Sequence, residues 1–417
     1  MQKIGFIFLV LMSFLVISEI GCQTKPQYKC EKLTGNIYEL SVDAGGYPDK
    51  VIVSAGNDGL LIVDSGDREN GEALKEVLIS FNKGMPKFII NSHSHIEHIG
   101  GNIAVGDSAV IIGHCKLRER YTNGLYLFLN VPEKYIPSIT FNDSMSIFFN
   151  GEEIKLISFA GAHDNSDIIV WFTKSNVLCA GALCANHHLT TIDNETGDIR
   201  KYIPIVDKLI ERIPDDILIV PGHSEDCGRP EMKQFRDMLV STSNIIKSEL
   251  QKGGSIQSMI EKDILSAWTS YENYATKDYW IQLWANAVKN HNSVEWNKPK
   301  PYWEIYEKIN ESGVEEAIKL YRKLKNEEKD KYYFDDRMLM YIGNLLWYVT
   351  NNQDAILFYK ACIEEIPESE TAYKCYFRLG NVYRSINHLI QAKECYEKYL
   401  QKFPFDKNVK KIIDGIK

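Results

Sequence analysis

The most informative segment of this chain reads Asn91-Ser92-His93-Ser94-His95-Ile96-Glu97-His98-Ile99-Gly100-Gly101-Asn102. It places three histidines and one carboxylate within six residues, directly after the apolar run 88–90. Imidazole is a common zinc ligand, and so short a run of ligands converges on one point only if the chain leaves a strand and turns sharply. We therefore predict a metal site at the end of a strand, with Gly100 and Gly101 allowing a helix to begin just after the ligands.

Two further histidines lie beside other predicted strands. His163 lies in a turn before the apolar run 168–172, and His223 follows the run 219–221 in a Pro-Gly-His turn. Asp64 ends a third apolar run. In their order and rough intervals these motifs resemble those of the metallo-β-lactamase superfamily, over about residues 30–290. Five of the ten histidines fall on motif positions of that family.

The resemblance implies an α/β hydrolase domain at 30–290, folded as a four-layer αββα sandwich with metals at the edge where the two sheets meet. The apolar patterning agrees, because short strand-like runs alternate with a few helical patterns between residues 37 and 225. The predicted strands are 37–42, 51–54, 60–64, 88–90, 110–112, 139–141, 154–159, 168–172 and 177–180, and the predicted helices are 69–81, 201–212 and several within 230–290.

His93, His95 and His163 are the predicted nitrogen ligands of one tightly bound zinc. Such a zinc keeps a fourth position for water whose pKa falls to about 7, so that hydroxide exists at neutral pH. The predicted function is an exported zinc-dependent hydrolase, in which metal-bound hydroxide attacks a small-molecule substrate such as an ester, a lactone, an amide or a β-lactam. The sequence does not choose among these substrates.

A second, more weakly bound zinc is predicted at Glu97, His98 and His223. The resemblance implies this set, because a branch of the family also lacks a ligand at the position of Ala182, where other members have a metal-binding aspartate or cysteine. Glu97 stands where most members have the aspartate that binds the second metal and orients the attacking water. It is the predicted catalytic base. Its extra methylene shifts the carboxylate by roughly an ångström, and such a misplacement can slow a reaction about a hundredfold.

Asp64 and Asp167 are predicted to support the metal ligands from outside. Metal-bound histidines usually donate their second ring N–H to a carboxylate or carbonyl, which fixes the tautomer. The resemblance gives Asp64 this role, whereas Asp167 either supports the loop of His163 or acts as a turn residue. Cys184 and Cys227 follow the motifs closely enough to serve as soft ligands, although an isolated cysteine is more often a small buried hydrophobe.

Five of the ten histidines have no place in the predicted metal sets, and three of these lie near the motifs. We expect His114, at the end of the apolar run 110–112, to be structural. His187 and His188 are predicted to form a surface pair in a loop that borders the pocket. The glycine-containing loop 44–48 is a candidate flap over the site.

The N-terminus predicts export across the cytoplasmic membrane. Lys3 precedes the apolar run 4–17, which is short for a membrane span, so residues 1–21 are predicted to be a signal. Gly21-Cys22 resembles the end of a bacterial lipoprotein signal, which implies a periplasmic or surface protein attached to the membrane through lipidated Cys22. Because Glu19 is unusual in such a signal, cleavage to a soluble secreted form is the first alternative, and a membrane-retained anchor is the second.

Composition limits the remaining choices. With 417 residues and 44% apolar content the chain is long enough for two or three globular domains. Its net charge of −8 is spread without a basic block, so we expect no nucleic-acid partner. Nine cysteines are scattered without the dense pattern of a stapled small domain, so the fold is not expected to depend on disulfides.

A helical segment, 302–417, follows a proline-containing linker at 291–301. Gly343, Ala355, Tyr359 and Pro367 recur 37 residues later as Gly380, Ala392, Tyr396 and Pro404. The pattern resembles tetratricopeptide (TPR) repeats, with a weaker earlier copy at 317–321. This small number of repeats is at the lower limit for a free-standing solenoid. We therefore expect the repeats to dock on the hydrolase domain. They predict a protein or peptide partner, or alternatively a structural cap or a dimerisation element.

A binding or scaffold protein is the competing functional hypothesis. Glu97 and Ala182 motivate it, because a weakened metal site can become purely structural while the repeats carry the function. Such a protein would hold less than about one zinc per chain and would show no zinc-dependent turnover.

Overall fold

The computed structural model describes residues 27–43, 48–122, 131–193, 196–273, 275–289, 298–334, 336–348, 351–404 and 406–416. The predicted signal with Cys22, most of the candidate flap and most of the linker lie outside these residues. Export and lipid attachment therefore stay predictions. Among the described residues, none of the helices combines the length and the apolar character that crossing a membrane requires.

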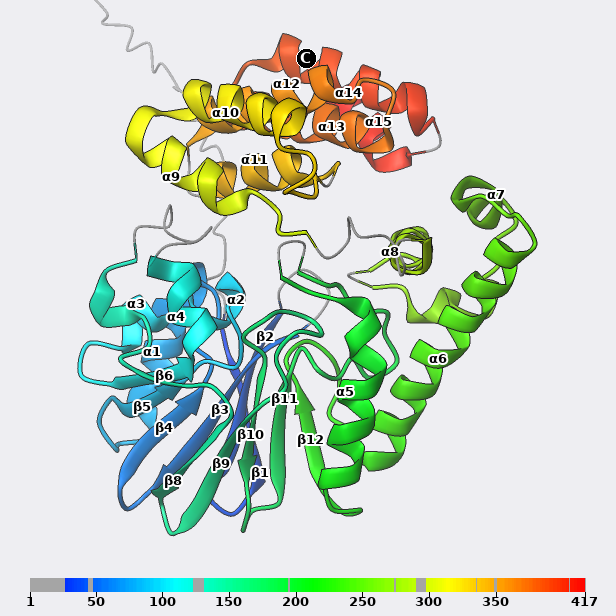
Figure 1. Ribbon diagram of the computed structural model, residues 1–417. Helices are drawn as coiled ribbons and strands as arrows, with labels where there is room; N and C mark the ends of the chain where they lie inside the picture. The colour runs from blue at the N-terminus through cyan, green and yellow to red at the C-terminus, as the bar shows by residue number, and fades with distance from the viewer. Residues whose placement is uncertain are drawn as a thin grey trace, which may run out of the picture.

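Two β-sheets form the centre of the N-terminal part (Figure 1). The first sheet consists, in spatial order, of β1 (Lys29–Thr34), β2 (Ile37–Asp43), β3 (Pro48–Gly56), β4 (Gly59–Val63), β5 (Pro86–Ile90), β6 (Val110–His114) and β7 (Ile139–Phe141). The second consists of β12 (Leu218–Pro221), β11 (Val177–Gly181), β10 (Ile168–Phe172), β9 (Glu152–Ser158) and β8 (Ser144–Phe149). Strands β4 to β7 are parallel, as are β11 and β12, and the other neighbours are antiparallel.

The central strands are buried on both faces. In β10, Ile168 and Val170 enter the core between the sheets, while Ile169 enters the core beneath the helices. Successive side chains of a strand point to opposite faces, so a strand covered on both sides consists of consecutive apolar residues. This explains why the interior strands were predictable from continuous apolar runs.

Helices cover the outer face of each sheet, which confirms the predicted αββα layers. Helices α1 (Gly71–Ser80) and α3 (Asn102–Val105) share a core with the first sheet, and α5 (Ile199–Arg212), α6 (Arg229–Gln251) and α8 (Lys277–Lys289) share one with the second. The short helices are α2 (Ile96–Ile99), α4 (Cys115–Thr122) and α7 (Ile256–Glu261), with 3-10 turns at Arg68–Asn70, Glu133–Tyr135 and Ser266–Tyr271.

Two strands, β1 and β8, were not predicted. Both lie at an edge of a sheet, β1 at the first and β8 at the second. Most side chains of β1 are exposed, and Phe148 of β8 is among the exposed large apolar residues. Edge strands that face water lack the apolar run that marks a buried strand, so local sequence gives them little signal.

The C-terminal part is helical, as predicted. It contains α9 (Tyr302–Ser312), α10 (Val314–Glu327), α11 (Met338–Tyr348), α12 (Asn352–Glu365), α13 (Glu370–Ser385), α14 (Leu389–Lys402) and α15 (Lys407–Gly415). The 37-residue sequence repeat corresponds to the pairs α11/α12 and α13/α14. We refer to α9 to α15 as the helical repeats.

The repeated glycine and tyrosine of each pair pack on each other. A Cβ atom on Gly343 would lie 2.8 Å from the ring of Tyr359, and one on Gly380 would lie 2.5 Å from the ring of Tyr396. Each tyrosine hydroxyl then donates to the asparagine that follows the glycine, at 2.8 Å in both repeats. The repeat in sequence is therefore a repeat of one helix-to-helix contact.

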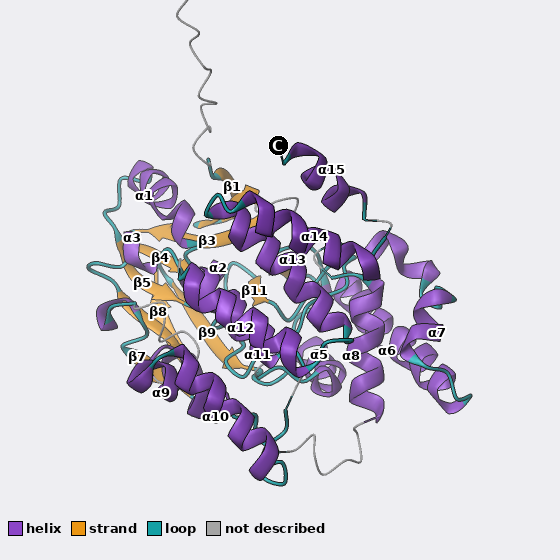
Figure 2. Ribbon diagram, turned by 90° about the horizontal axis from the view of Figure 1, so that it is seen from above, coloured by secondary structure: helices purple, strands orange, loops and turns teal. Residues whose placement is uncertain are grey.

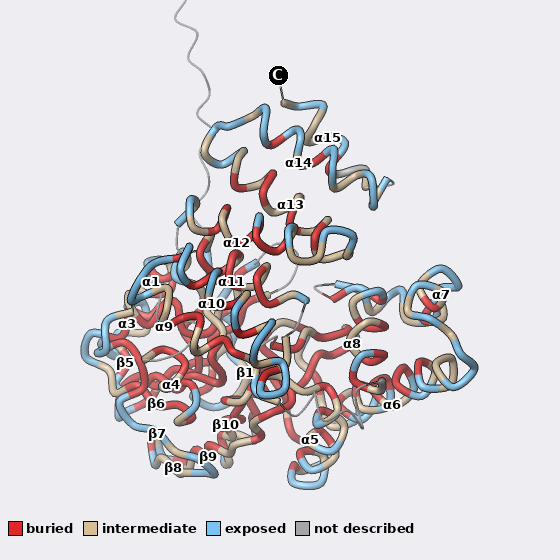
Figure 3. The backbone as a smooth tube through the Cα atoms, turned by 45° about the horizontal axis from the view of Figure 1, so that its top comes forward, coloured by how far each residue is buried: buried red, intermediate tan, exposed pale blue. Residues whose placement is uncertain are grey.

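The helical repeats dock on the N-terminal part, as predicted, and lie across the ends of its strands (Figures 1 and 2). One apolar cluster joins the two parts: Ile99, Leu117 and Tyr121 pack together with residues of α9 to α13. In Figure 3 buried segments run through α11, α12 and α13. The eight cysteines among the described residues are free, which agrees with a fold that does not depend on disulfides.

We predict that Gly380→Ala destabilises the helical repeats. Alanine normally stabilises a helix relative to glycine by about 0.5–1 kcal/mol, but here its methyl group would collide with the Tyr396 ring. Overpacking of this kind costs about 1–3 kcal/mol. Urea unfolding measures the change. Gly415→Ala is the control, because a Cβ at Gly415 meets nothing within 4 Å. Equal effects of the two substitutions would contradict the packing argument.

Candidate metal centre

The predicted ligands come together where the strands of the two sheets end. His93 and His95 follow β5, His163 follows β9, and His223 follows β12. Glu97 and His98 lie within α2, which begins at Ile96, so the helical turn starts before Gly100 and not after it as predicted. Gly101 instead permits a close approach, because a Cβ there would lie 2.0 Å from the backbone oxygen of Ser65.

His93, His95 and His163 form a group whose ring nitrogens lie within 4.8 Å of one another. The Nδ1 atom of His93 lies 3.0 Å from Ser92 Oγ, which itself donates to Asp64 at 2.7 Å. A hydroxyl has a single proton to donate, so Ser92 must accept the Nδ1 proton of His93. That leaves the lone pair on Nε2, which is buried and has no hydrogen-bond partner in the described structure. These residues fit a bound metal ion.

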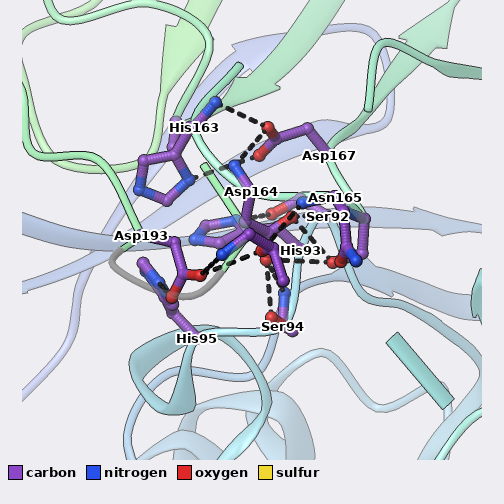
Figure 4. Close-up of polar contacts among 12 residues, drawn as sticks. Ser92, His93, Ser94, His95, His163, Asp164, Asn165, Asp167 and Asp193 are labelled. Atoms are coloured by element: carbon purple, nitrogen blue, oxygen red, sulfur yellow. Dashed lines mark hydrogen bonds and ion pairs between the residues drawn. The ribbon is translucent and has the colours of Figure 1, made fainter. Parts of the chain in front are cut away.

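The other two histidines of this group are also held at the ring nitrogen away from the site (Figure 4). His95 Nε2 lies 3.2 Å from Asp193 Oδ2, and His163 Nδ1 lies 3.3 Å from Asp167 Oδ1. Asp167 also accepts the backbone N–H groups of His163 and Asp164, at 3.0 and 2.7 Å. It therefore plays both roles considered for it, as a partner of His163 and as a turn residue.

His93 also belongs to a second group, with Glu97 and His98. His98 Nδ1 lies 2.8 Å from Asp64 Oδ2, which is the contact predicted for Asp64. The remaining nitrogen of His98, Nε2, faces His223 Nε2 at 2.9 Å. Among the described residues, Glu97 and His98 are therefore grouped with His93, and His223 contacts this group at His98 without being a member of it.

His223 is held by residues beside the candidate flap. Its Nδ1 atom lies 2.9 Å from Asp49 Oδ1 and 3.4 Å from the backbone oxygen of Pro48. Asp49 was not singled out in the sequence, because nothing in its local pattern distinguishes it from a polar residue at the start of a strand. Each of the five ligand histidines thus has an oxygen partner at one ring nitrogen.

Burial and charge set the protonation of the centre. Burial, followed by the neighbouring histidines, holds the pKa of His93 well below its usual range, so this ring is neutral. Burial would also lower the pKa of His95, but contacts with Asp193 and Glu97 raise it to about 10 in the metal-free chain, so a metal ion bound at Nδ1 would have to displace a proton. Although burial opposes ionisation of Glu97, His95 holds the pKa of its carboxyl well below its usual range. Glu97 is therefore an ionised carboxylate beside the ligands.

The centre opens into a cavity of about 230 Å³. Its lining consists of His95, Glu97, His163, Gly181, Ala182, Cys184, Thr190, Thr191 and His223. Ala182 lies on its wall, where the resemblance places a metal ligand in other members. Cys184 lines the cavity, but it belongs to neither group of candidate ligands among the described residues. Its sulfur lies 3.8 Å from that of Cys227, and both cysteines are buried as small side chains.

A buried polar layer lies behind the turn that carries His93 and His95, and the sequence did not predict it. Arg120 of α4 is 2% exposed and donates to Ser94 Oγ at 2.5 Å. It also contacts Asp164 at 3.4 Å and Asp193 at 3.2 Å (Figure 4 labels both carboxylates). An arginine on an ordinary helical pattern carries no local signal of burial, so this layer could be found only in the folded chain.

His114, His187 and His188 lie outside both candidate ligand groups among the described residues. His114 Nε2 lies 3.0 Å from the backbone oxygen of Asn142, a structural contact. His187 is exposed and His188 is partly exposed, and neither lines the cavity.

Part of this chain is similar to known proteins. Residues 50–223 match the family described as the metallo-beta-lactamase superfamily. The chain is 23% identical over 195 residues to metallo-beta-lactamase type 2 of Bacteroides fragilis, covering 46% of this chain and 74% of that protein. It is 27% identical over 90 residues to metallo-beta-lactamase IND-1 of Chryseobacterium indologenes, and the match covers 21% of this chain and 38% of that protein. A solved metallo-beta-lactamase of Pontibacter korlensis superposes with a TM-score of 0.45 at 16% identity, covering 51% of this chain and 99% of that one.

An ion-pair cluster lies next to the His223 side of the centre. Lys50 is buried and its Nζ lies 3.1 Å from Glu39 and 2.6 Å from Asp226. Two carboxylates here share one ammonium group, so one carboxylate lacks a full counter-charge. The pKa of Glu39 is raised to about 7, mainly by burial. Lys50 lowers this pKa, and Asp226 raises it further.

We predict that Glu39 makes the stability of the folded chain depend on pH. Its pKa is about 7 in the folded state and near 4.5 in the unfolded state, so the folded state binds the proton more tightly between these values. The contribution of Glu39 to the free energy of unfolding is therefore full below pH 4.5 and falls as the pH rises through 7. Urea unfolding of the parent and of Glu39→Gln at several pH values tests this. The glutamine variant should lose this part of the pH dependence, and identical pH profiles would contradict the assignment.

Proposed function

We propose that this chain, whose residues 50–223 form a domain of the metallo-β-lactamase superfamily, is a metal-dependent hydrolase. The observation that carries the proposal is the group His93, His95 and His163, whose nitrogens lie within 4.8 Å while the opposite nitrogen of each ring contacts an oxygen. A zinc ion held by three nitrogens polarises a carbonyl group and lowers the pKa of water at its fourth position to about 7.

The residues around the cavity have separate roles in this proposal. His93, His95 and His163 hold the first zinc, and His98 and His223 offer nitrogens for a second. Nitrogen-rich sites suit zinc better than magnesium or calcium, which prefer oxygen ligands.

Glu97 is the proposed base. Its carboxylate lines the cavity, is ionised, and lies 3.5 Å from His95 Nδ1. A third of its side chain is exposed, so water in the cavity can reach it. It orients that water and accepts its proton.

The proposed substrates carry an electrophilic carbonyl: esters, lactones and amides including β-lactams. The names of the relatives make a β-lactam the first substrate to test. Export, lipid attachment at Cys22 and a protein or peptide partner of the helical repeats are further parts of the proposal that rest on the sequence alone.

We expect protein purified without added metal to contain at least one zinc per chain and to hydrolyse a member of an ester, lactone and β-lactam panel. In His95→Ala, kcat/KM should fall by more than the 10–100-fold that loss of an outer partner of a ligand typically costs. Elemental analysis and initial rates measure the two quantities. His187→Ala is the matched control, since His187 is an exposed histidine outside the cavity lining. Less than one metal per chain with no turnover on the panel would favour the binding-protein hypothesis instead.

A second prediction concerns the carboxylate. Glu97→Asp restores the residue that the family usually has, so metal-dependent activity should be retained or increased. Glu97→Gln keeps the size but removes the base, which should lower kcat by about 10²–10⁴-fold. The pair is compared by kcat at saturating substrate. Total loss in the aspartate variant would show that the site is adjusted to the longer side chain.

A further inference from the structure

The helical repeats reach the metal centre at Asp193. Its Oδ2 atom lies 3.2 Å from three donors, namely His95 Nε2, Arg120 Nη2 and the hydroxyl of Tyr341. Tyr341 belongs to α11 and is separated from Asp193 by 148 residues. The other carboxylate oxygen, Oδ1, accepts the backbone N–H and the hydroxyl of Thr196 at 2.7 and 2.9 Å. A side chain of the repeats therefore shares a carboxylate oxygen with a ligand histidine.

Asp193 also contacts a second ligand histidine through its backbone. Its N–H donates to the backbone oxygen of His163 at 2.8 Å. Asp193 thus contacts two of the three histidines of the first group, one through its carboxylate and one through its backbone.

Tyr341 is held in place by its own surroundings. Its ring packs edge to face on Tyr302 of α9, with centroids 6.1 Å apart, and it lies against the apolar cluster that joins the two parts of the chain. One turn earlier, Arg337 lies beside the hydroxyl of Tyr279. That hydroxyl accepts the backbone N–H of Ile192 at 3.1 Å, the residue before Asp193. Tyr341 therefore contacts Asp193 directly, while Arg337, which precedes α11, reaches the neighbouring Ile192 through the Tyr279 hydroxyl.

We infer that Tyr341 is a positioning residue of the metal centre, and that the helical repeats form part of this centre. This inference rests on the metal binding proposed above. Donation from Tyr341 is one of the contacts that set the rotation of the Asp193 carboxylate, beside those from Thr196 and Arg120. The carboxylate in turn accepts the Nε2 proton of His95, so that the Nδ1 lone pair faces the site. Without the hydroxyl, Asp193 keeps its contacts with Arg120 and Thr196 but loses one of the three donors to Oδ2, and the His95 ring is held less firmly.

The test is metal affinity in the full-length chain. In Tyr341→Phe the dissociation constant for zinc, measured by competition with a chromophoric chelator, should rise about three- to tenfold, less than the 10–100-fold typical of a direct partner of a ligand. The visible absorption bands of the cobalt-loaded chain should shift as well, because they report the geometry around the ion. Thermal melting accompanies both measurements.

Tyr359→Phe is the matched control. It removes a buried tyrosine hydroxyl from the same helical repeats, where the partner is Asn344 at 2.8 Å and not a residue of the metal centre. Zinc affinity and the cobalt spectrum should stay unchanged in this variant. If the two variants change zinc affinity equally, or if neither changes it, the inference is wrong while the proposed function stands. A parent chain that binds neither zinc nor cobalt would overturn both.

A double-mutant cycle identifies the route of the effect. If Tyr341 acts through Asp193, adding Tyr341→Phe to Asp193→Asn should change zinc affinity less than the same substitution does in the parent chain. The reason is that the effects of substitutions at interacting residues do not add. Additive effects would show that Tyr341 acts by another route and would overturn the inference. The cycle uses differences in affinity, so a general loss of stability in either variant does not decide the result.

Discussion

The arrangement of the candidate metal centre depends on the hydrogen bonds of the Asp64 carboxylate. This carboxylate accepts the backbone N–H of Ser92 and the Ser92 hydroxyl, each at 2.7 Å, and contacts His98 Nδ1 at 2.8 Å. Asp64 itself has a φ of 62°, a left-handed conformation that aspartate tolerates better than most residues. This single side chain joins the end of β4 to the ligand turn after β5, and through Ser92 it sets the tautomer of His93.

A layer of buried charged side chains lies behind the turn that carries His93 and His95. Arg120 bridges Asp164 and Asp193, and these carboxylates accept further hydrogen bonds from Ser94 and Thr196. Buried charges are tolerated when they are paired and hydrogen-bonded, whereas the loss of one partner leaves an uncompensated ion. The layer therefore holds the backbone that carries His95 and His163.

The helical repeats obey a different constraint. Their helices approach closely because Gly343 and Gly380 leave room for a tyrosine ring, and their inner surface is completed by Ile99, Leu117 and Tyr121 of the N-terminal part. A small number of repeats cannot bury a continuous core alone. Docking supplies the missing apolar surface, and it is the same docking that brings α11 to the Asp193 loop.

The sequence alone was enough to predict a candidate set of metal ligands, the interior strands and the repeated helix pairs. Each of these is encoded locally, in the spacing of histidines around strand ends, in continuous apolar runs, and in a glycine and a tyrosine that recur at a constant interval. The edge strands β1 and β8 lacked such a run and were missed. Only the tertiary structure showed that Asp49 and Asp193 contact candidate ligands, and that Arg120 and Tyr341 contact Asp193. Asp193 lies 98 residues from His95 and 148 from Tyr341, and hydrogen bonds between such distant residues follow from how the layers pack, which no local pattern of residues records.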